Sequence, residues 1–234
     1  MSSGVDVLML GAHPDDVEIS CAGTVLHFVD QGREVVIADL TRGEKATRGT
    51  AESRADESAA ATRLLKIKER INLELPDTEL RDDHRALGAV VEILRRYRPR
   101  LLFAPHPVDV HPDHMAAAQI AHRAYFLAGL RNFAADTGAP HRADLLVRYP
   151  GNDPVEPTFC VDISHLEERK REVIRCYATQ VDLQSKDHLV KGLDPLERIV
   201  ARDRFYGAQI GCVAAEPFHL DGPLPMSNPG SLLE

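Results

Sequence analysis

The chain has 234 residues, and its 36 acidic side chains against 28 basic ones give a formal net charge of −8. This acidic balance argues against a broad nucleic-acid surface, because such surfaces carry a basic patch or stripe. No apolar run approaches the roughly 20 residues that span a bilayer, and the first residues lack the basic segment of a signal peptide. We therefore expect a cytoplasmic protein with neither nucleic-acid nor membrane partners.

The first half of the chain alternates between expected strands and helices. Short apolar runs predict the strands, whereas amphipathic or Ala- and Glu-rich stretches predict the helices. In chain order these are a strand at 5–10, a helix at 18–30, a strand at 34–40, a helix at 51–66, a strand at 70–75, a helix at 84–98 and a strand at 100–104. Such alternation predicts an α/β fold, a three-layer α/β/α Rossmann-like domain with a mostly parallel sheet.

The second half predicts further elements on the same sheet. They are a helix at 113–128, strands at 145–149 and 158–163, helices at 164–177 and 195–209, and a Pro-rich extended tail from 215 to 234. The chain shows no internal repeat and no linker. We expect one domain over residues 1–234, with a Rossmann-like core over about 1–130 and the additional strands, helices and tail over 131–234.

Cysteine and histidine usage differ in what they indicate. The four cysteines have no CxxC spacing, which argues against a disulfide framework and against paired-cysteine zinc sites. Eleven histidines are present, several of them beside aspartates. This composition permits a metal site built from nitrogen and oxygen ligands.

Two polar motifs follow expected strands. The first strand runs into Gly-Ala-His-Pro-Asp-Asp-Val-Glu at 11–18, and the fourth runs into His-Pro-Val-Asp-Val-His-Pro-Asp-His at 106–114. Because ligands of open α/β sheets bind outside the carboxyl ends of the strands, both motifs fall on one edge of the sheet. Either motif alone also suits a helix N-terminus, but their convergence on one edge favours a functional site.

The motifs contain a candidate ligand set. His13 and Asp16 are three residues apart and can present two ligands from one turn, and His114 can supply a third. Two imidazoles and a carboxylate with an open position form a hydrolytic zinc site, although the same ligands suit other divalent ions.

Three further residues are candidates for the chemistry. Asp15 has no ligand duty and is placed to take a proton from water. In the second motif we expect Asp113 to orient and charge His111, which then stabilises an oxyanion or protonates a leaving group.

Other residues have simpler interpretations. Glycine patterns for dinucleotides or phosphates are missing after the first strand. Cys21 is interpreted as a small buried side chain, and the segment 82–84 as a helix start. Four histidines are expected on helix surfaces: His27, His122, His165 and His188. Two others, His106 and His219, are not expected to bind metal.

The motif at 12–18 together with 111–114 resembles the paired signature of the LmbE-like (PIG-L) metal-dependent deacetylases. These enzymes remove the N-acetyl group from N-acetylglucosamine-containing substrates. Further segments are similar to the bacillithiol-biosynthesis branch, which deacetylates N-acetylglucosaminyl-malate: 40–44, 47–50, 72–77 and 98–99.

The resemblance implies roles for the motif residues that agree with those inferred from spacing. It assigns metal binding, usually of zinc, to three of them, general-base catalysis to Asp15 and transition-state stabilisation or acid catalysis to the pair His111 and Asp113. The implied metal ligands are His13, Asp16 and His114.

The resemblance also implies substrate contacts at Glu44, Arg48 and Arg54, where an arginine suits a malate carboxylate. For Arg54, a solvated helix arginine is the alternative. The implied partner is a small N-acetylglucosamine conjugate, and homo-oligomers are implied by family membership alone.

One departure affects the substrate. Val110 stands where the malate-specific branch often has arginine, which weakens the argument for a malate aglycone. The alternatives are a deacetylase of another amino sugar, such as a mycothiol precursor, a chitooligosaccharide or an antibiotic intermediate, a non-catalytic metal- or sugar-binding protein, and a phosphoester hydrolase.

Overall fold

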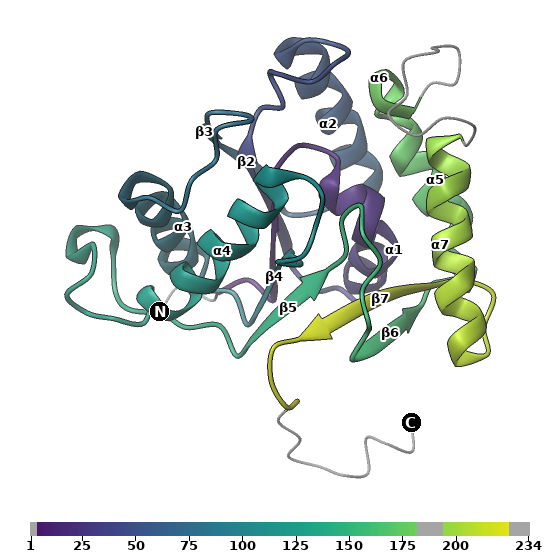
Figure 1. Ribbon diagram of the computed structural model, residues 1–234. Helices are drawn as coiled ribbons and strands as arrows, with labels where there is room; N and C mark the ends of the chain where they lie inside the picture. The colour runs from purple at the N-terminus through teal and green to yellow at the C-terminus, as the bar shows by residue number, and fades with distance from the viewer. Residues whose placement is uncertain (1–3, 182–193, 225–234) are drawn as a thin grey trace.

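The computed structural model describes residues 4–181 and 194–224, and within them seven strands form one sheet (Figure 1). The strands are β1 Val7–Gly11, β2 Val35–Thr41, β3 Glu69–Leu75, β4 Leu101–Pro105, β5 Leu145–Tyr149, β6 Phe159–Asp162 and β7 Ala215–Leu220. Their order in the sheet is β3-β2-β1-β4-β5-β7-β6. Strands β1 to β5 are parallel, whereas β7 runs antiparallel to both of its neighbours. The predicted α/β class with a mostly parallel sheet is confirmed.

Helices cover both faces of the sheet. The helical elements are α1 Asp16–Asp30, α2 Ala51–Leu65, α3 His84–Tyr97, α4 Pro112–Leu127, α5 Glu167–Arg175, α6 Ala178–Val181, α7 Pro195–Ile210 and the short 3-10 turns η1 Ala135–Thr137 and η2 Ser164–Leu166. Helices α3 and α4 lie on one face, and α1, α2 and α5 on the other (Figure 1). No helix in the described ranges is long and apolar enough to cross a membrane.

The apolar run of β1 explains the two-sided core. Leu8 and Leu10 pack with the α3 and α4 side chains, while Val7 and Met9 pack with those of α1, and all four are fully buried. A strand buried on both faces has no polar alternation, which is why its sequence is a continuous apolar run.

The chain end differs from the sequence expectation. Residues 215–220 form β7, inserted between β5 and β6, where the sequence predicts only an extended tail. Proline within a strand and a charged residue beside it hide the strand pattern. Glu216 is fully buried, and hydrogen bonds offset the cost of burying its charge. Lys170 Nζ donates to its Oε1 at 2.7 Å, and the N–H groups of Gly23 and Thr24 also donate to its carboxylate.

The expected helix at 164–177 is also divided. It consists of η2 and α5, and α6 follows immediately after it. The remaining tail at 225–234 and His188 lie outside the described residues.

Strand order determines where a site can form. Strand β1 lies between β2 and β4, so the strand order reverses at β1: the chain adds β2 and β3 on one side of it and β4 and β5 on the other. At such a point the loops that follow the two central strands, here β1 and β4, run to opposite faces of the sheet and leave a crevice between them. Both sequence motifs are in these two loops.

We predict that Lys170→Met lowers the free energy of unfolding by roughly 3–5 kcal/mol, because Glu216 and Asp203 would lose their buried cation, 2.7 Å from each. Chemical denaturation measures the change. Lys68→Met is the matched control, since its pair with Glu34 is exposed and its loss should cost under about 1 kcal/mol. Equal costs for the two variants would contradict the importance of burial.

Candidate active site

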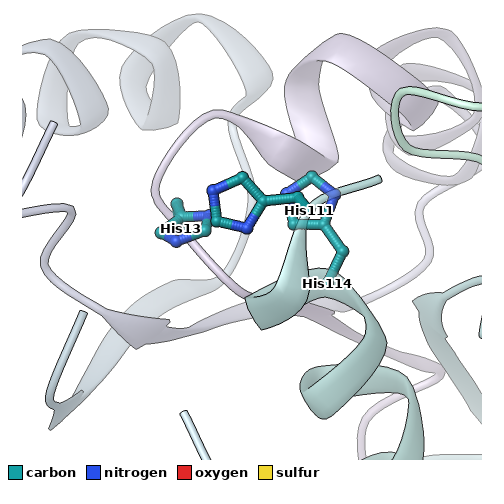
Figure 2. Close-up of side chains that lie close together, drawn as sticks. All are labelled: His13, His111 and His114. Carbon is teal, nitrogen blue, oxygen red and sulfur yellow. The ribbon is translucent and has the colours of Figure 1, made fainter. Parts of the chain in front are cut away.

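Three histidines from the two motifs gather at the carboxyl edge of the sheet. His13 lies in the loop after β1, His111 is the N-cap of α4, and His114 is in the first turn of α4 (Figure 2). Their ring centroids are 4.8 Å apart for His13 and His111, 4.7 Å for His111 and His114, and 5.5 Å for His13 and His114. The fold therefore brings together two segments that are about a hundred residues apart in sequence.

Asp16 lies between two of these rings. Its Oδ1 is 3.2 Å from Nε2 of His114, and its Oδ2 is 3.6 Å from Nδ1 of His13. The same Oδ2 accepts the backbone N–H of His13 at 2.9 Å. The three residues that the sequence singles out as candidate ligands are thus in mutual contact.

The second nitrogen of each ring contacts another carboxylate. His13 Nε2 is 3.1 Å from Asp77 Oδ1 and 3.3 Å from Asp113 Oδ2, and His114 Nδ1 is 3.1 Å from Asp109 Oδ2. Metal-ligating histidines usually donate their outer N–H to a carboxylate in this way, which fixes the tautomer and the ring orientation.

Asp77 and Asp109 were not selected by the sequence analysis. Asp77 Oδ2 accepts the N–H of Lys45 at 2.7 Å, and its own N–H donates to Glu44 Oε1 at 3.0 Å. Asp77 follows the end of β3 by two residues and therefore lies on the same sheet edge as the motifs. From this position in the sequence it could have been predicted as a site residue.

Asp109 is held by four donors. Besides His114, it accepts the N–H groups of His111 at 2.7 Å and Asn152 at 2.8 Å, and the Asn152 side-chain amide at 3.1 Å. Gly151 permits this approach, because a Cβ there would lie 2.0 Å from Asp109 Oδ2. The loop after β5 gave no signal of this contact in the sequence.

Asp113 contacts His111 through its backbone, while its carboxylate has other hydrogen-bond partners. That carboxylate accepts the N–H of Thr78 at 2.7 Å and of Leu80 at 3.3 Å and contacts His13. The backbone N–H of Asp113 donates to His111 Nδ1 at 3.2 Å. This contact follows from α4 itself, because an N-cap side chain accepts from the first helical turn.

This contact defines the tautomer of His111. A ring nitrogen that accepts a backbone N–H carries no hydrogen, so the neutral ring has its hydrogen on Nε2. Burial and the neighbouring His114 and His13 lower the pKa of His111, which favours the neutral form. Nε2 is therefore the ring nitrogen of His111 that can donate a hydrogen bond.

Asp15 has a strained backbone and a buried carboxylate. Its φ of 128° is unfavourable for a residue with a side chain, and such strain concentrates at functional sites. Although it is the N-cap of α1, its side chain makes no capping bond. Burial raises its pKa to about 7, against the lowering effect of Arg54.

The expected substrate contacts occupy different surroundings. Arg54 is 4% exposed, so the alternative of a solvated helix arginine is wrong. Its Nη1 lies 2.9 Å from Asp15 Oδ2 and donates to the carbonyl of Pro14 at 2.6 Å. Glu44 Oε2 is buried without a hydrogen-bond partner among the described residues, and the carbonyl of Arg48 accepts from Gln180 at 3.3 Å.

His84 begins α3 after its N-cap Asp83, and two of the histidines expected on helix surfaces, His122 and His165, are exposed. His106 and His219 pack against each other with centroids 5.4 Å apart. Cys21 is fully buried, as expected.

The charges of the site suit a cation. Burial opposes protonation of His13, but hydrogen bonds to Asp113, Asp16 and Asp77 raise its pKa to about 12. Asp16 and Asp109 likewise raise the pKa of His114 to about 10 against the effect of burial.

Two sets of donor atoms each lie within 4.8 Å of one another: His13, His111 and His114, and His13, Asp77 and Asp113. Nitrogen and oxygen donors without thiolate fit zinc or another divalent ion.

Comparisons with known proteins agree with this geometry. The family model of the GlcNAc-PI de-N-acetylases, PIG-L, matches residues 8–125. Diacetylchitobiose deacetylase of Thermococcus kodakarensis is 30% identical over 195 residues, which cover 74% of this chain and 69% of that protein.

A 1D-myo-inositol 2-acetamido-2-deoxy-alpha-D-glucopyranoside deacetylase of Salinispora arenicola is 26% identical, covering 75% of this chain and 76% of that one. The crystal structure of a conserved protein of Thermus thermophilus superposes with a TM-score of 0.86 at 38% identity, covering 95% and 97% of the two chains.

We predict that Asp109→Asn weakens binding of a divalent metal by about 10–100-fold, because His114 would lose the carboxylate that orients its ring. Calorimetric titration with zinc measures the affinity. Asp136→Asn is the matched control, since Asp136 is exposed in η1. Unchanged zinc affinity in Asp109→Asn would show that the contact does not orient a ligand.

Proposed function

The chain belongs to the PIG-L family of GlcNAc-PI de-N-acetylases, and from this membership we propose that it is a zinc-dependent deacetylase of an N-acetylglucosamine conjugate. The observation that carries the proposal is the position of Asp16 between Nδ1 of His13 and Nε2 of His114. Each ring also has its outer nitrogen on a carboxylate, as metal-ligating histidines usually have.

We assign the metal to His13, Asp16 and His114. Bound there, a divalent ion would lower the pKa of a water molecule and polarise the amide carbonyl. The second donor set is less suitable, because both carboxylate oxygens of Asp113 accept backbone N–H groups, whereas among the described residues Asp16 accepts one only through Oδ2.

Asp15 is the general base. Its carboxylate is next to Asp16 and is buried, and a pKa of about 7 suits a group that takes a proton near neutral pH. Arg54 holds the carboxylate from the side of α2 and favours its ionised form. In the reaction, Asp15 accepts a proton from water as the water oxygen bonds to the acetyl carbon.

His111 stabilises the oxygen of the amide. Its Nε2–H can donate to the negative charge that develops on that oxygen, because Nδ1 is already occupied by the N–H of Asp113. The C–N bond then breaks, the nitrogen receives the proton, and the products are a free amine and acetate.

For the aglycone we propose malate, from the resemblance of residues 40–44, 47–50 and 72–77 to the bacillithiol branch. A neutral sugar aglycone is the second candidate. Two observations favour it: Val110 is 70% exposed where that branch often has arginine, and the Arg54 guanidinium is already paired with Asp15.

An intact base and a full ligand set argue against a non-catalytic binding protein. The homo-oligomeric state, the cytoplasmic location and the single-domain organisation stay predictions from the sequence.

The test of this function is amine release from a panel of N-acetylglucosaminides. We expect turnover of N-acetylglucosaminyl-malate that a chelator abolishes and zinc restores. Faster release from diacetylchitobiose or from the inositol glucosaminide would replace the malate assignment. Chelator-resistant turnover, or no release from any member, would contradict the proposed function.

We predict that Asp15→Asn and His111→Ala each lower kcat by about 10²–10⁴-fold, since each removes a group that acts on the reacting atoms. Both variants should keep zinc, which elemental analysis measures. Loss of zinc in His111→Ala would instead make His111 a ligand, and near-full turnover would remove its catalytic role.

We predict that Arg54→Met moves the acidic limb of the kcat/KM pH profile to higher pH. The Arg54 cation lowers the pKa of Asp15, so its removal raises that pKa, and the base is then protonated at higher pH. Arg63→Met, in the last turn of the same helix, is the control. If the acidic limb does not shift, Arg54 does not influence the pKa of the catalytic base.

A further inference from the structure

A small cavity of about 60 Å³ lies beside the candidate ligands Asp16 and His114. It lies between the first turns of α1 and the loop after β5. Its other walls come from Ile19 and Ser20 of α1, Pro105 and Tyr149 at the ends of β4 and β5, and Gly151 and Asn152. None of these six residues has a role in the proposed reaction.

Polar groups in these walls are already bonded elsewhere. The Ser20 hydroxyl donates to the carbonyl of Pro150 at 2.7 Å, and the Tyr149 hydroxyl donates to the carbonyl of Leu10 at 2.5 Å. The Asn152 side-chain amide donates to Asp109 at 3.1 Å. What remains is a largely apolar wall with a polar end at Asp16 and His114.

The apolar walls and the polar end of the cavity determine which chemical group it can bind. A sugar hydroxyl placed against the apolar wall would lose its hydrogen bonds to water without replacement. An acyl group fits better, because its carbonyl would lie at the polar end formed by Asp16 and His114, the proposed metal ligands, and its methyl group needs no partner. The cavity therefore suits the acetyl end of the amide, not the sugar end.

The size of the cavity limits the length of the acyl chain. One water molecule needs roughly 10–15 Å³ of such space, whereas a cavity of about 150 Å³ accommodates benzene. A volume of about 60 Å³ lies between these values, enough for a two-carbon group and too little for an aromatic or a long chain.

Ile19 is the wall residue that can be changed without breaking a polar contact. Its backbone N–H donates to the carbonyl of Asp15 at 2.8 Å, so α1 places its side chain one turn after the base. Gly151 tolerates no side chain, because a Cβ would lie 2.7 Å from His114 Nδ1.

We propose that this cavity receives the acyl group and that Ile19 limits its length, so that the enzyme selects N-acetyl over longer N-acyl substrates. The inference rests on the proposed deacetylase function. It adds a determinant of specificity on the acyl side of the scissile bond, independent of the aglycone.

The test compares N-acetyl, N-propionyl and N-butyryl forms of one glucosaminide. One methylene in an apolar pocket changes kcat/KM by roughly 10–200-fold, so we expect a loss of about tenfold or more at propionyl and a further loss at butyryl. Ile19→Ala should raise the propionyl-to-acetyl ratio by about tenfold. Ile67→Ala removes the same atoms between α2 and β3, outside the cavity, and should leave the ratio unchanged.

Two further variants and a binding measurement support this comparison. Ile19→Phe should lower turnover of the acetyl substrate itself, and Ile19→Val should shift the ratio in the direction of Ile19→Ala if the latter fails to fold. Calorimetry with acetate and butyrate gives a readout without turnover. Acetate should bind more tightly to the unmodified enzyme, and the difference should shrink in Ile19→Ala.

The outcomes separate the two hypotheses. No amine release from any acyl form would contradict the deacetylase function. Release from the acetyl form, with equal kcat/KM for propionyl or with a ratio that Ile19 substitutions do not change, would overturn the acyl-cavity inference alone.

Discussion

The excess of negative charge at the carboxyl edge of the sheet is the constraint on which the site depends. Five aspartates surround two imidazoles there: Asp15, Asp16, Asp77, Asp109 and Asp113. Buried carboxylates are unfavourable unless they are paired or hydrogen-bonded. The surrounding loops meet this requirement with backbone N–H groups, including those of Lys45, Thr78 and Asn152, and the remaining negative charge would stabilise a bound cation.

A second buried layer of charge fixes the start of α1 beneath the site. Arg70 on β3 bonds Asp39 through Nε at 2.7 Å and Nη2 at 2.8 Å, and its Nη1 contacts Glu18. Glu18 also accepts from the Tyr177 hydroxyl at 2.9 Å. Because Glu18 lies in the first turn of α1, just after Asp15 and Asp16, Arg70 fixes the start of the helix that carries the proposed ligand and the proposed base.

The sequence predicts the parts of this arrangement that depend on local pattern. Apolar strands, their alternation with helices and the polar motifs after β1 and β4 are sufficient to place His13, Asp16 and His114 on one edge. Contacts made by tertiary packing were missed. Asp109 is held by the loop after β5. Strand β7 can be buried with the charged Glu216 in it only because Lys170 of α5 donates to that carboxylate. Arg54 looks like a solvated residue until α2 packs against α1.

The same turn of α1 carries the proposed ligand, the base and the wall of the acyl cavity. Asp15, Asp16 and Ile19 are within five residues, so a change of backbone that enlarged the cavity would also displace the base. The opposite rim is different, because Val108 and Val110 in the loop before α4 are 62% and 70% exposed. Both side chains are apolar, so replacing them removes none of the ion pairs of the site. We therefore expect substitutions at Val108 and Val110 to alter contacts to the aglycone more than contacts to the acyl group, because neither residue lines the proposed acyl cavity.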